Sequence, residues 1–340
     1  MTERRARPTI HDVARRAGVS ATTVSHTFSG KGVVAAATRE RVRETARELG
    51  YRPDALAQGL RNSRLGVIGL VLRPLETLDT AQPVGVDYFL RFAGSAAIAA
   101  MELGYGLMLI PDPTRESSPA AASACDGFLV TEPVADDPLL AMLHTERIPF
   151  LSVGRDPNTS YETWIDTDTE ALTLEVLTHL ERGGAQRIAL VAGTDRNSWN
   201  ADTEAAYLAW CADRVQPPLL VRQPETAGES GGRLAADELL DATAAPDAVY
   251  CLTGRHAAGF LARAHELGIA VPGDLQIVAG SDSEQSRVAN PPITAVDLQP
   301  ELLARVAVGK LAGALDGREP TLSDETAGRL IVRASTRHTS

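Results

Sequence analysis

From residue 65 onward, short apolar runs alternate along the chain with longer amphipathic segments. The apolar runs predict strands at residues 65–72, 105–110, 126–130, 149–153, 187–193, 248–254 and 275–280. The amphipathic segments predict helices that include residues 89–103, 169–182, 203–213, 232–242 and 255–267. Apolar strands that alternate with helices indicate parallel sheets covered on both faces. Two such sheets would bind a ligand in the crevice beyond the carboxyl ends of their strands.

Ahead of this region, residues 9–50 predict three short helices. The first is capped by Thr9, with Asp12 in the reciprocal position three residues later, and it ends at Gly18. Its apolar positions follow the spacing of an amphipathic helix: Ile10, Val13, Ala14 and Ala17. Val19, in the turn that follows, can plug the core between the helices.

The second helix is capped by Ser20, and Val24 and Phe28 are expected on its inner side. The residues expected on its outer side are Ala21, Thr22, Ser25 and His26. Two short helices joined by a glycine turn present the second helix to a DNA major groove. A generic three-helix bundle with a charged, solvated face is the alternative for this pattern.

The third helix is expected within TRERVRETARELG, with Thr38 as its cap and Gly50 at its end. Its inward positions are Val42, Ala46 and Leu49, and its basic residues are Arg39, Arg41, Arg43 and Arg47. Residues 1–61 hold 12 of the 33 Lys and Arg but only 6 of the 44 Asp and Glu, although the net charge of the chain is −11. A small basic head on a large acidic body suggests that only the head meets a polyanion.

The segment PDALAQGL, residues 53–60, starts like a helix with Asp54 as its cap. It is only about two turns long, and isolated helices of that length are marginal in water. Gly59 weakens it by roughly another 1 kcal/mol relative to alanine. The segment is therefore either a plain linker or a helix that folds only against a partner.

These residues resemble the DNA-binding head and hinge of the LacI/GalR (lactose-repressor) family. The resemblance runs almost without gaps over residues 9–61 and continues more weakly through DGFLV, GDLQIVAGSD and LIVRAST. It implies that the second helix reads base edges. It also implies that residues 54–60 form a hinge helix when two subunits bind an operator, and that Leu60 wedges into the minor groove. An apolar wedge of this kind can unstack a base step and kink the duplex.

The same resemblance implies an all-α helix-turn-helix head followed by a periplasmic-binding-protein-like α/β core of two parallel-sheet subdomains. The DNA-binding domain would span residues 1–61, and the effector-binding and dimerisation domain residues 65–340. Within the core, the first subdomain would comprise residues 65–162 plus 293–322. The second would comprise residues 163–292 plus 326–340.

The residues that the resemblance implies for DNA binding are Thr9, Ser20, Ala21, Thr22, Thr23, Ser25, His26, Ser29, Thr38, Tyr51, Asp54, Ala57 and Leu60. Some depart from the family pattern. His26 stands where members usually carry arginine, and Ser29 and Asp54 stand where they carry asparagine. Ala21 and Thr22 occupy the positions most tied to base choice. Because both are small, they suggest methyl contacts with thymine or readout through water.

The residues implied for effector binding are Tyr88, Phe89, Ser152, Thr203, Thr253 and Asp282. Tyr88 and Phe89 could stack on a sugar ring or a flat ligand, or they could be core aromatics. Asp282 could accept a ligand hydroxyl or cap a helix. Thr203 replaces a family arginine, the group best suited to a carboxylate or a pair of hydroxyls. We expect a small-molecule effector of the sugar or sugar-like kind.

Other chemistry is weakly signalled. GESGG, residues 228–232, fits the G-x-S-x-G pattern of hydrolases, but a polar run separates it from the nearest expected strand, so Gly231 and Gly232 are read as opening a helix. The seven histidines show no metal-ligand spacing, and three distant cysteines indicate free thiols. We expect no catalytic residue, no metal and no cofactor.

No apolar run approaches the length of a membrane span, and the N-terminus lacks the apolar core of a signal peptide. These features predict a cytoplasmic protein with no membrane partner. The sequence thus predicts a homodimeric regulator that binds a pseudo-palindromic operator under effector control. A small-molecule binding module that has lost specific DNA readout is the alternative.

Overall fold

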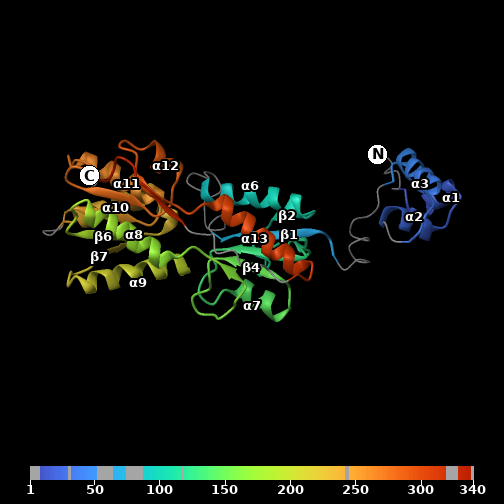
Figure 1. Ribbon diagram of the computed structural model, residues 1–340, viewed down its shortest axis with the longest axis horizontal. Helices are drawn as coiled ribbons and strands as arrows, with labels where there is room; N and C mark the ends of the chain where they lie inside the picture. The colour runs from blue at the N-terminus through green and yellow to red at the C-terminus, as the bar shows by residue number, and fades with distance from the viewer. Residues whose placement is uncertain are drawn as a thin grey trace. The chain divides into compact units, whose positions relative to one another are not determined.

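The computed structural model describes residues 8–29, 32–51, 64–73, 87–116, 118–241, 245–318 and 328–337 (Figure 1). Contacts divide the chain into two units, residues 1–66 and residues 67–340. Each unit is described by itself. The hinge helix expected at residues 54–60 lies outside the described residues.

The first unit is a head of three helices packed round a small core. The helices are α1 (Ile10–Ala17), α2 (Ala21–Ser29) and α3 (Ala36–Leu49). The buried core residues are Val13, Ala14, Ala17, Val24, Val42 and Ala46. Ile10, Val19, Phe28 and Leu49 are partly buried against them, and the ring centroids of Phe28 and Tyr51 are 6.0 Å apart. The positions expected to face inward on the three helices are confirmed.

Local hydrogen bonds fix the ends of the first two helices. The Thr9 hydroxyl accepts from the Asp12 N–H at 3.4 Å, and the Asp12 carboxylate accepts from the Thr9 N–H at 2.9 Å. Gly18 follows α1 with φ of 66°, in the left-handed region that glycine tolerates. The Ser20 hydroxyl accepts from the Thr23 N–H at 3.1 Å. The predicted reciprocal cap, glycine turn and serine cap are confirmed.

The expected cap of the third helix is wrong. α3 begins at Ala36, ahead of Thr38, and its N-cap is Ala35, which has no side chain that can accept a hydrogen bond. Alanine has the highest intrinsic helix propensity, so Ala36 and Ala37 join the helix and leave Thr38 inside its first turn. Gly50 ends the helix with φ of 67°, as expected.

The second unit contains two sheets. The strands of the first are β1 (Val67–Leu72), β2 (Gly106–Leu109), β3 (Gly127–Thr131), β4 (Phe150–Val153) and β5 (Trp164–Ile165). They are parallel and lie in the order β2-β1-β3-β4-β5. This sheet is the framework of the first subdomain.

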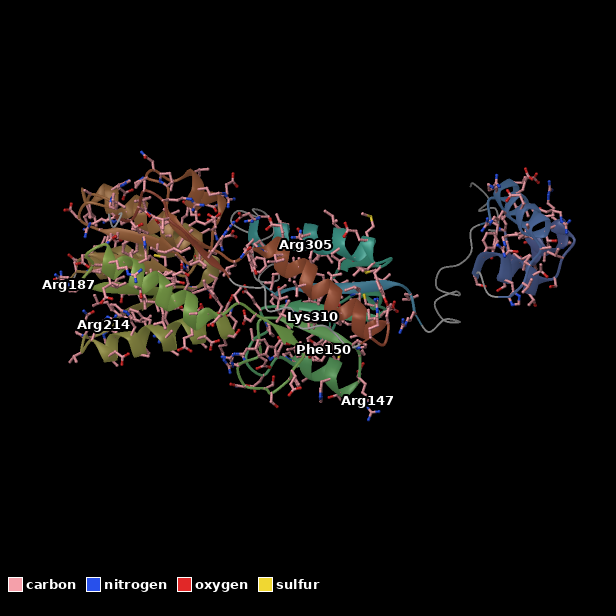
Figure 2. The ribbon with its side chains drawn as sticks, in the orientation of Figure 1. Arg147, Phe150, Arg187, Arg214, Arg305 and Lys310 are labelled. Atoms are coloured by element: carbon pink, nitrogen blue, oxygen red, sulfur yellow. The ribbon has the colours of Figure 1, made fainter. Side chains whose placement is uncertain are left out.

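Helices cover both faces of the first sheet (Figure 1). They are α6 (Asp87–Glu102), α7 (Pro138–Thr145) and α13 (Pro300–Leu315). Leu70 and Leu151 point to the face covered by α6 and α13, while Val71 and Phe150 point to the face covered by α7. Phe150, labelled in Figure 2, is buried there. Because successive side chains of a strand alternate, each strand contributes to both hydrophobic layers.

The second sheet has the order β11-β10-β9-β8-β6-β7, and β11 alone runs antiparallel, against β10. Its strands are β6 (Ile188–Ala192), β7 (Leu219–Arg222), β8 (Ala248–Cys251), β9 (Gln276–Ala279), β10 (Thr294–Asp297) and β11 (Arg329–Ile331). α8 (Thr169–Arg182) and α9 (Ser198–Asp213) cover one face, and α10 (Gly228–Leu240) and α11 (Gly254–Glu266) cover the other. The short helix α12 (Glu284–Val288) follows β9.

All seven predicted strands and all five predicted helices are present within a few residues of their expected bounds. Strand β5 belongs to the first sheet and β10 to the second, so the chain crosses between subdomains after Ile165 and after Asp297. The boundaries expected at residues 162/163 and 292/293 are therefore a few residues early. The third crossing, expected between residues 322 and 326, lies outside the described residues.

Candidate functional site

The head places most of the predicted DNA-binding residues on its surface. The exposed or partly exposed ones are Thr9, Ser20, Ala21, Thr22, Thr23, His26, Ser29, Thr38 and Tyr51. Ser25 is 8% exposed, so the expectation that it faces outward is wrong. Ala21, one turn earlier, packs partly against the head core, which shows that this side of α2 turns further inward than the apolar pattern indicated. Asp54, Ala57 and Leu60 lie outside the described residues.

Arginines surround these residues on α1 and α3. Arg15, Arg16 and Arg47 form exposed ion pairs with carboxylates of the same head. Exposed pairs of this kind contribute little to stability, so the guanidinium groups can exchange a carboxylate for a phosphate at small cost. Arg41 instead braces the head, because its Nε donates to the Ala17 carbonyl at the end of α1 at 3.1 Å.

The second unit contains a cleft at the carboxyl ends of the strands of both sheets. Its lining includes residues that follow β3, β4, β5, β6, β7, β8 and β9, together with the start of α6. These are the positions at which an open parallel sheet offers a ligand site. The cleft is lined by Asp87, Tyr88, Phe89, Glu132, Val153, Gly154, Asp166, Thr167, Asp195, Asn197, Ser198, Trp199, Asn200, Glu225, Thr226, Leu252, Thr253, Gly254, Arg255, Ser281, Asp282, Ser283, Leu298 and Leu303.

Four of the six predicted effector-binding residues line this cleft: Tyr88, Phe89, Thr253 and Asp282. The rings of Tyr88 and Phe89 meet edge to face with centroids 5.0 Å apart. Thr253 caps α11 by accepting from the His256 N–H at 3.1 Å. Asp282 forms ion pairs with Arg287 at 3.1 Å and Arg333 at 2.8 Å. Its carboxylate is therefore already held by two guanidinium groups.

Ser152 and Thr203 do not line the cleft, which corrects their assignment as effector-binding residues. Ser152 is buried in β4 on the same face as Phe150, so it points toward α7, and Val153 and Gly154 reach the cleft in its place. Thr203 is fully buried in α9, beyond Asn200. A threonine side chain is too short to extend from that position to the cleft.

The cleft gathers carboxylates that the sequence analysis did not identify. Burial, and after it the charge of neighbouring carboxylates, raises the pKa of Glu132 to about 8. Burial raises the pKa of Asp166 to about 6, although the Thr167 N–H donates to it at 2.8 Å. Burial and the charge of Glu225 raise the pKa of Asp195 to about 6. At neutral pH, the empty cleft therefore holds Glu132 mainly in its protonated form.

Glu225 is held differently from these three. Its carboxylate accepts from the backbone N–H groups of Thr194 at 3.1 Å and Asp195 at 3.2 Å, and from Asn200 Nδ2 at 2.6 Å. Asn200 also donates to the Asp195 carbonyl and accepts from the Gly193 N–H. This network fixes the loop after β6 and uses Glu225 as its anchor.

Several polar contacts cross the cleft from one subdomain to the other. Arg155, after β4, pairs with Asp202 of α9. Arg287 of α12 pairs with Asp87 of α6 at 2.9 Å. The Ser198 hydroxyl donates to Asp166, at the crossing after β5, at 3.3 Å. These contacts place charged groups where closure or opening of the cleft would make or break them.

The residues that sequence reasoning missed share one signal, which is their place just beyond a strand. Glu132 directly follows β3, Asp166 directly follows β5, and Asp195 comes three residues after β6. Trp199, in the first turn of α9, also lines the cleft. A search for acidic residues one to three positions after each predicted strand would have found Glu132 and Asp195, but not Asp166, because β5 is too short to be predicted.

The described residues contain no metal-binding group and no membrane-spanning helix, and the serine of the G-x-S-x-G pattern lies in a helix. Ser230 of the G-x-S-x-G pattern lies in the first turn of α10 and donates to the Ala227 carbonyl at 2.6 Å, so it belongs to a helix as the sequence analysis expected. Within the described ranges, no group of three or more His, Cys, Asp or Glu could hold a metal ion. No helix in the same ranges has both the length and the apolar character needed to cross a membrane.

Two family models match the chain in the order of its two units. Residues 9–54 match the model described as bacterial regulatory proteins, lacI family. Residues 177–336 match the periplasmic binding protein-like domain. The two models therefore cover the head and the greater part of the second subdomain.

Relatives match over nearly the whole chain. The HTH-type transcriptional repressor PurR of Erwinia tasmaniensis is 30% identical over 340 residues, covering 96% of this chain and 96% of that protein. The structure of the transcriptional regulator CelR in complex with cellobiose is 26% identical, with a TM-score of 0.69 over 97% of this chain and 100% of that chain. A lac repressor dimer bound to operator and the anti-inducer ONPF shares the fold, with 24% identity and a TM-score of 0.80 over 98% of this chain and 100% of that chain.

Proposed function

The chain belongs to the lacI family of bacterial regulatory proteins, and we propose that it is a homodimeric repressor whose cleft ligand controls its affinity for a pseudo-palindromic operator. One observation carries the proposal. A basic helix-turn-helix head and a cleft lined by polar and aromatic side chains occur in the same chain. The head would bind DNA, and the cleft would bind a small molecule that changes the affinity of the head for DNA.

Base reading is proposed for the exposed side of α2. Thr22 is exposed and His26 is partly exposed, while Val24 holds the helix to the core. Thr22 offers a methyl group and a hydroxyl to a base edge, and His26 offers a ring nitrogen. Arginines of α1 and α3 would contact phosphates and set the orientation of the head without reading sequence.

Dimerisation is proposed through the first subdomain. Six exposed apolar side chains of this subdomain lie on one side of α6 and on the edge strand β2 and its approach: Leu90, Ile98, Met101, Leu103, Met108 and Leu109. The opposite side of α6, which includes Phe92 and Ala96, packs on the sheet. An apolar helix face beside an edge strand fits the same surface of a second copy, related by a twofold axis.

The dimer would couple the cleft to DNA through spacing. Ligand binding changes the relative stability of open and closed clefts, which the contacts across the cleft also set. A small change in the separation of the two first subdomains would then shift the folding of the paired hinge segments at residues 54–60. The cleft would bind and release a sugar or sugar-like molecule unchanged, without catalysis. The protein would work in the cytoplasm, where operator DNA lies.

Selection of binding sites from random DNA duplexes with the full-length protein tests the proposal. We expect a palindrome with a flexible pyrimidine–purine step at its centre. Thr22→Glu should abolish recovery of the motif, because it places a negative charge in the major groove. Thr145→Glu, the same change at an exposed position of α7, is the matched control and should recover the wild-type motif.

The opposite result is equally informative. If no motif is recovered at physiological salt, with or without pooled metabolites, the head does not read DNA specifically. The protein would then be a small-molecule binding module, the alternative to a repressor.

A further inference from the structure

Building on the proposed effector role of the cleft, we propose that its ligand is an organic cation. The ligand would carry a protonated amine that lies between Glu132 and Asp195, and a ring that lies against Tyr88. The amine would be the positively charged partner of these two carboxylates. A neutral ring compound could donate hydrogen bonds to these carboxylates but would leave their charge unbalanced.

The charge balance of the cleft supports a cation. Among the described residues that line it, six are carboxylates and one is an arginine. The carboxylates are Asp87, Glu132, Asp166, Asp195, Glu225 and Asp282, and the arginine is Arg255. Asp87 and Asp282 share Arg287, and Glu225 is held by the loop after β6. The remaining carboxylates are those nearest the proposed amine.

Glu132 and Asp195 have few partners within the described part of the chain. Glu132 accepts a single long hydrogen bond there, from Asn197 Nδ2 at 3.4 Å. For the Asp195 carboxylate, the described residues provide no side-chain or backbone donor in hydrogen-bond geometry. Glu132 also has φ of 45°, a left-handed conformation that costs a non-glycine residue on the order of 1 kcal/mol. Such strain collects at ligand sites, and Glu132 is one of the residues that line the cleft.

The nearby cations are engaged elsewhere. Arg155 pairs with Asp202, and Arg255 donates to the Glu225 carbonyl at 2.7 Å. Of the exposed arginines labelled in Figure 2, Arg147, Arg187 and Arg214 lie on the outer parts of the two subdomains, and Arg305 lies on α13. Among the described residues, no arginine or lysine is one of the groups whose charge shifts the pKa of Glu132.

Two features of the described residues favour an organic cation over a metal ion: aromatic side chains line the cleft, and its carboxylates do not form a metal-binding group. Tyr88, Phe89 and Trp199 line the same cleft and provide flat apolar surface beside the carboxylates. Aromatic faces attract organic cations as well as stacking on rings. Within the described ranges, the carboxylates are not arranged as a metal-binding group. The site therefore suits a ring that carries an amine.

The proposal predicts a pH dependence with a definite sign. The groups that face Glu132 are Tyr88 of α6, Asp166 after β5, Asp195 and Asn197 after β6, and Glu225 after β7. Burial, and after it the charges of Asp195, Glu225 and Asp166, disfavours the charged form of Glu132 and raises its pKa to about 8, and none of the facing groups is a cation. A bound amine favours the charged form. Affinity for an amine should therefore rise as pH rises toward and past that value.

Calorimetric titration of the full-length protein with charge-matched probes tests the proposal. Two sets are used, each with an amine, a neutral and an acidic member: glucosamine, glucose and glucuronate, and benzylamine, benzyl alcohol and benzoate. We expect one amine or both to bind about tenfold or more tightly than its neutral partner, the ratio that one charge-assisted hydrogen bond supplies. Benzylamine affinity should increase between about pH 6 and about pH 8.5.

Variants connect the result to the two carboxylates. Glu132→Gln and Asp195→Asn should each reduce the ratio of amine affinity to neutral affinity toward unity, because each removes one negative charge. Glu146→Gln, the same change at an exposed position after α7, is the matched control and should keep the wild-type preference. Retention of amine preference in both cleft variants would assign the charge recognition to other groups and overturn the proposal.

The remaining outcomes separate this inference from the function on which it rests. If neither amine binds more tightly than its neutral partner, including the case in which no probe binds, the inference is overturned. If a neutral probe binds best and shifts operator affinity, the inference falls and the repressor function stands. If an amine binds best but operator affinity does not respond, the cation site stands and its effector role falls.

Discussion

The head and the cleft are opposite in charge and in construction. The head builds its surface from consecutive residues of three short helices, with arginines around α2 and their carboxylate partners exposed to solvent. The cleft collects residues from the ends of eight strands that are far apart in sequence, and its carboxylates are partly buried. An exposed charge on the head can therefore exchange one partner for another at small cost. A carboxylate in the cleft is costly to ionise unless a group of opposite charge lies beside it.

The two regions therefore require different things in order to form their binding surfaces. The head needs only a small core and correct caps, because its charges stay in water. The cleft needs both sheets to be folded and correctly placed before Glu132, Asp166 and Asp195 lie close together. Substitutions in the head should therefore change DNA binding alone, and substitutions in the cleft should change ligand binding first and DNA binding second.

The largest expected effect is loss of the head without loss of the cleft. Val42→Asp places a carboxylate in the fully buried core of three helices, at a cost of about 4 kcal/mol or more. A core of this size has little stability to spare, so the head should unfold and specific DNA binding should disappear. Circular dichroism should show partial loss of helix, while ligand binding in the cleft stays at the wild-type value.

Val33→Asp is the matched control, because Val33 is exposed in the loop before α3. It should leave the thermal unfolding of the head unchanged. If Val42→Asp also abolished ligand binding, the two units would not fold independently.

A smaller effect is expected at the hinge. If Leu60 is the apolar wedge that the family resemblance implies, Leu60→Gly should weaken operator binding by roughly ten- to hundredfold, because an apolar wedge offsets the cost of kinking the duplex. Nonspecific, salt-sensitive binding depends on phosphate contacts and should stay nearly intact. Titrations on operator and on random duplexes at several salt concentrations measure both. Equal loss on the two kinds of DNA would mean that Leu60 is no specificity wedge.

The same contrast explains how far the sequence could predict each region. In the head, Thr9, Gly18 and Ser20 act on residues three or four positions away, so their spacing predicts their roles. The misassignment of Thr38 as a cap arose because Ala36 and Ala37 extend the helix past a local signal, an outcome that propensity decides by only tenths of a kcal/mol. Ser25 was misplaced because burial depends on how α2 is rotated against α1 and α3, which the pattern of one helix does not determine.

In the core, apolar runs predicted seven of the described strands but missed β5, β7, β10 and β11, and they could not predict which strands pair. β5 is only two residues long, so it has no periodicity to detect. Glu132 and Asp195 follow different strands in different sheets, and only the crossing of the chain brings them to one cleft. Sequence reasoning placed Ser152 at the site because the family resemblance assigned its position to effector binding. It could not tell that the residue faces α7.

An intermediate effect is expected from pH. Because the folded-state pKa of Glu132 is raised to about 8 from an ordinary value of 4.5, its contribution to stability is fully present below 4.5 and is lost as pH rises through about 8. Glu132→Gln cannot ionise and should lack this loss. Denaturant unfolding of the ligand-free protein at several pH values should show the variant gaining on the wild type, by on the order of 1 kcal/mol, as pH increases. A difference that stays constant with pH would show that Glu132 ionises freely in the folded protein.

The smallest expected effect concerns the bridge across the cleft. Arg287→Gln removes the contact between α12 and Asp87 of α6, which links the two subdomains without ligand. Arg287 is 39% exposed, so the bridge contributes less than about 1 kcal/mol, and loss of the closed state should weaken ligand binding only about threefold.

Arg233→Gln is the matched control, since Arg233 is equally exposed but pairs with Glu266 inside the second subdomain. If calorimetry shows the loss for Arg287 alone, the bridge stabilises the closed cleft. Equal losses for both would make it an ordinary surface ion pair, and closure would depend on the ligand and the buried carboxylates instead.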